Sequence, residues 1–166
     1  MSHRPIQSLF LSVLLCAGVL GACTACGDEP PVMVAKRLDA RTTLTVAGEP
    51  VDCELALSRE EISVGLMYRR ELPDDQGMLF VFTGESDRSF YMKNVPIPLD
   101  LCFLDTAGRV INIVRGEPQQ REPKLRSERP ARYVLELAGG WAERHGLQPG
   151  AQIQIADEVA ALGLFP

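Results

Sequence analysis

The apolar run MLFVF, residues 78–82, constrains the fold of this chain more than any other feature. It lies between turn-forming segments at 73–77 and 84–87. Five consecutive apolar residues predict a strand that is buried on both faces, because a strand with one wet face would alternate apolar and polar residues. Such a strand belongs in the interior of a domain, with packed side chains on both sides of its sheet.

Shorter patterns predict the other elements. In the segment 51–57, Asp52 and Glu54 alternate with apolar residues, which is typical of a half-buried strand. Ser58 and Glu61 match the S-x-x-E capping box and predict a short helix through about Met67. The expected strands cover 42–48, 51–57, 78–82, 90–92, 99–104, 109–114, 133–137 and 151–155, a second short helix covers 140–145, and a charged surface loop covers 115–130.

The N-terminus has the features of a secretion signal. His3 and Arg4 precede an apolar run of about a dozen residues, too short to span a bilayer at about 20 residues. The run ends in Leu20-Gly21-Ala22-Cys23, which resembles a bacterial lipobox. We therefore expect residues 1–22 to be a lipoprotein signal peptide and Cys23 to be acylated. The alternative is an ordinary signal peptide that is cut at a small-residue site.

The segments beyond the signal predict a tethered domain in the bacterial cell envelope. Residues 23–39 are polar with a Pro-Pro pair and read as an extended tether, 40–158 as the folded domain, and 159–166 as a C-terminal tail. Acylated Cys23 would hold the chain on the lipid bilayer, with the domain in the periplasm or extracytoplasmic space.

The charge balance excludes some partners. The chain has a formal net charge of −5, and loss of Arg4 with the signal would leave about −6. An acidic protein of this kind is not expected to bind nucleic acid or to adsorb electrostatically to anionic lipid.

Two cysteines lie inside predicted strands. An exported compartment permits disulfides, so Cys53 and Cys102 could form a bridge. Buried cysteine is also a common small apolar residue, and both alternatives stay open. The cysteines lack the spacing of a metal site, and we expect no metal or cofactor.

The stretch SFYMKNVPIPLD, residues 89–100, combines packing residues with polar groups. Pro96 and Pro98 lack backbone N–H groups, so the stretch cannot be a regular central strand. One interpretation is a hairpin in which Lys93 and Asp100 form a surface ion pair. The other is a small-ligand site at an aromatic rim. Its candidate residues are Arg69, Tyr91, Lys93, Asn94 and Asp100.

Two further chemistries are weaker alternatives. A hydrolase could use Asp100 or Glu136 with Lys93, provided that the fold brings carboxylates together. The chain has no nucleophile elbow and no phosphate-binding loop, so we lean against an enzyme. Thioethers favour Cu(I), and the relevant residues would be Met67, Met78 and Met92.

Several blocks of the chain resemble one family. GLMYRREL, GMLFVF, SFYMKNVPIPLD, NIV, ARYVLEL and GLQPGAQI, from about Val51 to Ile155, are similar to the domain of unknown function 192 family. Tyr91 stands where the family has Trp, and Val95 where it has Thr. The resemblance implies a compact, β-rich, barrel-like single α+β domain with one or two short helices, often exported or lipid-anchored. It brings no assigned activity. We therefore expect a membrane-anchored lipoprotein that serves as a binding or accessory module for a small ligand or an envelope partner.

Replacing Cys23 with serine removes the thiol that would carry the lipid. We expect Cys23→Ser to leave the membrane fraction or to keep its signal peptide, while the wild-type protein sediments with membranes. Immunoblots of fractionated cells measure both effects. A variant that fractionates and migrates like wild type would rule out the lipobox.

Overall fold

The computed structural model describes residues 35–162. The predicted signal peptide, Cys23, most of the predicted tether and the last four residues of the predicted tail lie outside these residues.

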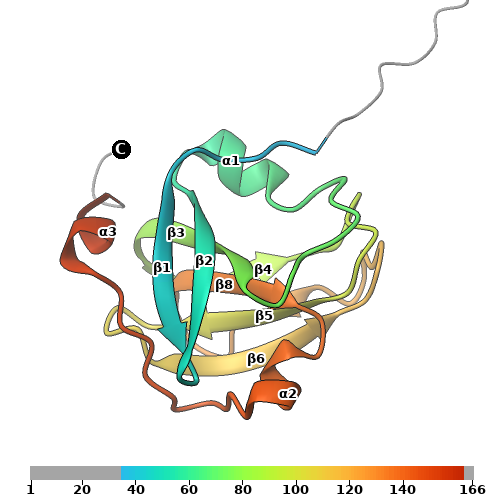
Figure 1. The fold of residues 1–166 in the computed structure, drawn as a ribbon. Helices are drawn as coiled ribbons and strands as arrows, with labels where there is room; N and C mark the ends of the chain where they lie inside the picture. Colours follow the sequence, from blue (N-terminus) through green and yellow to red (C-terminus); the bar gives the residue numbers. More distant parts are fainter. Residues whose placement is uncertain (1–34, 163–166) are drawn as a thin grey trace, which may run out of the picture. The chain divides into compact units, whose positions relative to one another are not determined.

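A six-stranded sheet forms the centre of the domain (Figure 1). Neighbouring strands are antiparallel except β2 and β3, which are parallel. The sheet has two edges, β1 and β6, so the expected barrel-like closure is not confirmed. In order across the sheet the strands are β1 (Arg41–Val46), β2 (Glu49–Ala56), β3 (Gln76–Ser86), β8 (Ala131–Ala138), β5 (Leu99–Leu104) and β6 (Val110–Gly116).

The two central strands are buried on both faces, as the MLFVF run predicts. Side chains alternate along β3, so Leu79 and Val81 enter one core while Met78 and Phe80 enter another. We name these the first core and the second core. The first core is closed by Trp141, Leu147, Ile153 and Val159, which follow β8 in the chain. The second core is closed by Leu66, Met92, Val95 and Leu125, which come from segments outside the six-stranded sheet.

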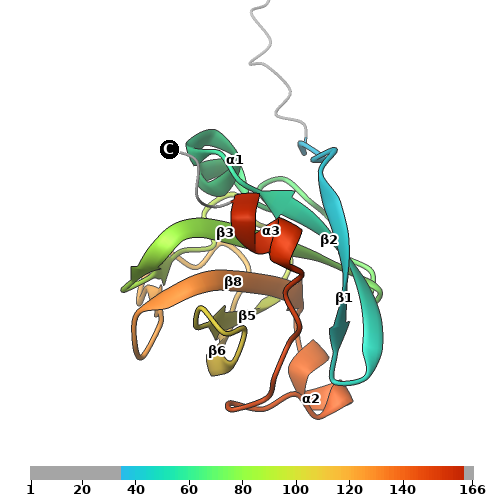
Figure 2. The same ribbon diagram turned by 90° about the vertical axis from the view of Figure 1, so that its left-hand side faces the viewer.

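Within the described part of the chain, three short helices accompany the sheet (Figures 1 and 2). They are α1 (Arg59–Val64), α2 (Trp141–His145) and α3 (Asp157–Leu162). The predicted capping box is present at α1, because the Ser58 hydroxyl accepts from the Glu61 N–H and the Glu61 carboxylate accepts from the Ser58 N–H at 2.9 Å. The helix is shorter than expected and ends before Gly65, whose φ of 47° breaks the helical path. The sequence did not predict α3. This helix packs near β3 and crosses the boundary between the predicted domain, 40–158, and the predicted tail, 159–166.

None of the helices within residues 35–162 is long and apolar enough to cross a bilayer.

Two strand predictions and one hairpin prediction need correction. The expected strand at 151–155 is only a bridge from Gln152 to Arg109. The expected strand at 90–92 is the two-residue β4 (Ser89–Phe90), which pairs with β7 (Leu125–Arg126) inside the presumed loop. Since β4 does not pair with β5, residues 89–100 are not a hairpin. The proline-bearing connection instead passes over the second core with Met92 and Val95 buried.

Cys53 and Cys102 are free, buried thiols rather than a disulfide. They belong to β2 and β5, and the strands β3 and β8 lie between these in the sheet. Burial raises the pKa of the Cys53 thiol to about 12, and burial also raises the pKa of Cys102. Both thiols therefore act as apolar core residues.

Reducing agents should leave the melting temperature of the domain unchanged, because there is no bridge to break. Cys53 and Cys102 should react with a thiol reagent in guanidinium but not in native buffer, since both thiols are buried and protonated. Labelling of the Cys23→Ser, Cys26→Ser protein with and without denaturant, followed by peptide mapping, measures this. A loss of melting temperature on reduction would contradict the assignment.

Candidate functional site

Glu136 is an acidic residue in the middle of the sheet. It lies on β8 opposite Met78 of β3 and Leu101 of β5. These two neighbours belong to the second core, so the Glu136 side chain points to the same face. The residue is 5% exposed.

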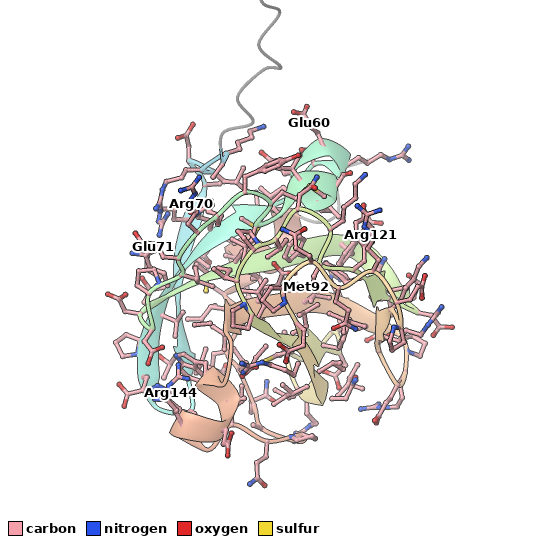
Figure 3. The ribbon with its side chains drawn as sticks, turned by 90° about the vertical axis from the view of Figure 1, so that its right-hand side faces the viewer. Glu60, Arg70, Glu71, Met92, Arg121 and Arg144 are labelled. Carbon is pink, nitrogen blue, oxygen red and sulfur yellow. The ribbon has the colours of Figure 1, made fainter. Side chains whose placement is uncertain are left out.

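A cavity of about 410 Å³ opens at this point, within the size range of small-molecule sites. Its walls come from α1 and the turn after it, from β3, and from the chain between residues 87 and 95. Figure 3 views the molecule with Met92 near the centre and Glu60 of α1 at the upper edge. Four aromatic residues line the cavity, namely Phe80, Phe82, Phe90 and Tyr91.

The Glu136 carboxyl has no partner among the described residues. Neither a hydrogen bond nor an ion pair reaches it from residues 35–162, and burial raises its pKa to about 8. The carboxyl is therefore mostly protonated at pH 7. Glu136 is a carboxyl kept neutral by an apolar site, which is a frequent property of functional residues.

Charged side chains lie elsewhere around the cavity. The Arg88 guanidinium stacks on the Phe82 ring at 3.6 Å and donates through Nε to the Ala131 carbonyl at 2.9 Å. Burial lowers its pKa. Lys93 is exposed and forms no ion pair within the described part of the chain. Asp87 also lines the cavity, is exposed and forms no ion pair within residues 35–162, so the unpaired charges at the cavity are those of Asp87 and Lys93.

Asp100 is separated from this cavity by the sheet. It lies on β5 opposite Leu137, so its side chain points to the opposite face from Glu136. Its carboxylate accepts from the backbone N–H groups of Gly140 and Ala142, each at 2.9 Å, and fixes the start of α2. The expected ion pair with Lys93 is wrong: the cationic partner is Arg115, at 3.4 Å. Asp100 and Glu136 cannot act as an acid–base pair at one site.

Arg69 is a buried structural residue. It is 3% exposed and donates to Glu54, itself 2% exposed, with 2.8 Å between Nη1 and Oε1. It also donates to the Lys36 carbonyl at 2.7 Å, which joins the segment before β1 to β2. Burial opposes ionisation of Glu54, but the hydrogen bonds from Arg69 and Leu38 outweigh it and lower the pKa of Glu54. Arg69 is therefore already paired within the protein.

Asn94 lies beside the cavity and holds two loops together. Its φ is 61°, and its side-chain amide donates to the Tyr68 hydroxyl at 2.8 Å. Gln119 accepts from the Asn94 backbone N–H at 3.0 Å. Tyr68 and Gln119 also have positive φ, of 63° and 60°, so three strained residues meet here. Asn94 thereby fixes the chain that carries Lys93.

The structure thus brings Tyr91 and Lys93 to the cavity and leaves Arg69, Asn94 and Asp100 in structural contacts. Sequence reasoning named Glu136 only for catalysis, and it expected an aromatic rim but missed Phe80 and Phe82 of β3. The signal that could have found it is the acidic residue within YVLEL, a strand otherwise apolar on both faces.

The methionines occupy separate places. Met67 lines the cavity, whereas Met78 and Met92 are buried in the second core. Among residues 35–162, no cluster of three His, Cys, Asp or Glu side chains is placed to hold a metal ion.

Glu136→Gln should change how stability depends on pH. The folded-state pKa is raised from 4.5 to about 8, so the folded protein binds the proton more tightly than the unfolded chain. Wild-type stability should therefore fall as pH rises from about 5 to 8, by roughly 3–4 kcal/mol relative to Glu136→Gln. Urea unfolding across this pH range measures the difference. Glu143→Gln, on an exposed position of α2, is the matched control, and parallel curves for wild type and Glu136→Gln would contradict the raised pKa.

Comparison with known proteins agrees with this architecture. The model of the DUF192 family, described as "Uncharacterized ACR, COG1430", matches residues 42–155. No curated protein matches the chain. The crystal structure of a protein of unknown function from Novosphingobium aromaticivorans DSM 12444 is 32% identical, with a TM-score of 0.67 over 75% of this chain and 94% of that one.

A second crystal structure is similar to the same degree. It is of a protein from Sinorhizobium meliloti 1021, provisionally described as a transcription regulator, and it is 32% identical, with a TM-score of 0.64 over 74% of this chain and 95% of that one. Because the family model covers more than half of the sequence, the chain belongs to the DUF192 family, the domain of unknown function 192.

Proposed function

We propose that this protein is a membrane-anchored lipoprotein of the cell envelope that binds a small, largely apolar molecule in the Glu136 cavity. One observation carries the proposal: a buried carboxyl without a protein partner faces a cavity with aromatic walls. A few polar groups within a mainly apolar cavity are the usual composition of a small-ligand site.

The other buried carboxylates of the sheet support this reading. Glu54 is paired with Arg69, and Asp100 accepts two backbone N–H groups. Glu136 is buried to a similar extent and has neither kind of partner within residues 35–162. An unpaired buried carboxyl lowers stability, and proteins keep such costly groups mainly where function requires them.

The envelope location rests on the N-terminal motif. Acylation of Cys23 would attach the protein to a bilayer, and residues 23–35, before Lys36 is held by Arg69, could extend to at most about 45 Å. The domain could then meet molecules or partner proteins of the envelope within that distance of the bilayer. The net charge of −5 does not favour DNA as the partner, so the description of the S. meliloti protein is not transferred.

A hydrolase that uses Glu136 with Lys93 is the second candidate. Both residues line the same cavity, and a carboxyl with a pKa of about 8 is protonated at neutral pH and able to donate its proton. Asp100 has no part in this candidate, because it faces the other side of the sheet. Conversion of a bound molecule by wild type but not by Glu136→Gln would favour the enzyme over the binding module.

The binding proposal predicts that a neutral aromatic compound enters the cavity. We expect 2-phenylethanol at millimolar concentration to shift the amide resonances of residues 62–67 and 87–95 in a ¹⁵N-labelled sample. Glycerol, which has no apolar body, should leave these resonances unchanged. Perturbations centred on β6 or α2, or none at all, would contradict the cavity as the binding site.

A further inference from the structure

The Glu136 cavity contains a carboxyl group and an ammonium group that do not pair with each other. Glu136 lies at the inner wall and Lys93 at the exposed side, and no ion pair joins them. Elsewhere in residues 35–162, buried acids meet cations or backbone donors. The acids of the cavity without a partner within residues 35–162 are buried Glu136 and exposed Asp87, and the base without one is Lys93. Asp87 stays hydrated at the exposed side, so the buried Glu136 carboxyl and the Lys93 ammonium are complementary to a ligand that carries both an ammonium and an anionic group.

We propose that the ligand is an ampholyte, with an ammonium group at Glu136, an anionic group at Lys93 and an apolar, preferably aromatic, body between them. The proposal rests on the proposed binding function and specifies the chemical class of its ligand.

The ammonium end follows from the inner wall. A charge-assisted hydrogen bond from an ammonium group would satisfy the one buried carboxyl that has no partner among residues 35–162. Aromatic rings of the second core surround this region: Phe80 and Phe90 pack edge to face with centroids 5.2 Å apart. Ring faces also attract cations, so the wall favours an ammonium group over a second acid.

The anionic end follows from the exposed side. Asp87, Arg88, Tyr91 and Lys93 are the titratable residues that line the cavity besides Glu136. Arg88 already donates to two backbone carbonyls and stacks on Phe82, so it adds positive charge but few free donors. The Lys93 ammonium has no protein partner within residues 35–162 and can bind a carboxylate or phosphate.

Binding of an ammonium group should release a proton. The Glu136 carboxyl is protonated in the free protein at pH 7 and ionised when it faces a cation, so the proton leaves to solvent. Below pH 8, affinity for an ammonium ligand should therefore rise about tenfold per pH unit and level off near pH 8. An anionic ligand without an amine should lack this dependence.

Four probes of similar size separate the contributions of the ammonium group and the anionic group to binding. They are L-phenylalanine, phenethylamine, 3-phenylpropanoate and 2-phenylethanol. Calorimetry on the full-length protein at pH 6, 7 and 8 measures affinity and proton release. We expect L-phenylalanine to bind at least tenfold more tightly than 2-phenylethanol at pH 7, with one proton released.

Two variants assign the ends. Glu136→Gln should weaken the binding of L-phenylalanine and of phenethylamine at least tenfold, and the affinity for 3-phenylpropanoate should not change. Lys93→Met should instead weaken the binding of L-phenylalanine and of 3-phenylpropanoate. Glu143→Gln and Lys124→Met, on exposed positions outside the cavity, are matched controls and should bind like wild type.

The outcomes distinguish this inference from the function on which it rests. If 2-phenylethanol binds as tightly as L-phenylalanine, or if Glu136→Gln binds L-phenylalanine like wild type, the ampholyte is wrong and the apolar site remains. If none of the four probes binds at millimolar concentration, both proposals are overturned.

Discussion

The pairing of β3 with β8 is the contact on which the rest of this structure depends. Both strands are buried on both faces, so each face must be covered by apolar side chains from elsewhere. After β8, the chain supplies Trp141, Leu147, Ile153 and Val159 to close the first core. The second core is covered by irregular connections and by α1, which has no buried residue. Irregular segments pack a sheet less completely than a continuous layer does, and the cavity lies on this side.

Burial of acidic groups in such a sheet is costly, and the molecule resolves that cost in three different ways. Glu54 receives the guanidinium of Arg69. Asp100 receives backbone donors at the start of α2. Glu136 stays protonated, because its apolar surroundings raise its pKa to about 8. The first two arrangements join segments of the chain to the sheet. The protonated Glu136 carboxyl, unlike Glu54 and Asp100, makes no contact that joins two segments within the described residues.

Local chemistry explains which parts of the fold the sequence predicts. The MLFVF run and the capping box at Ser58 depend on neighbours in the sequence, and the expected central strand and helix start are found. The segment 151–155 has a strand-like composition but meets only one bridging partner, so long-range pairing decides against it. The pairing of β4 with β7 likewise depends on residues about 36 apart, which no local pattern encodes.

The site is less predictable for a related reason. Lys93 and Tyr91 stand out because they lie in one unusual stretch, and both line the cavity. Asp100 lies in the same stretch, but strand register turns it to the other face. Arg69 donates to Glu54, fifteen residues earlier in the chain, and does not line the cavity. The sequence identifies polar residues with unusual neighbours, while the face of the sheet on which each lies follows from the pairing of distant strands.

Because α1 has no buried residue, it can move without disturbing the core, and this affects how a ligand would reach the cavity. The helix is held by its capping box, by half-buried Ile62 and by an exposed ion pair from Lys36 to Glu60, and none of these contacts belongs to the β3–β8 ladder. Segments with few buried contacts open at a small fraction of the free energy needed for global unfolding. Entry and exit of the proposed ligand beside α1 would therefore leave the sheet intact, and its residence time would be set by local opening of one helix rather than by the stability of the domain.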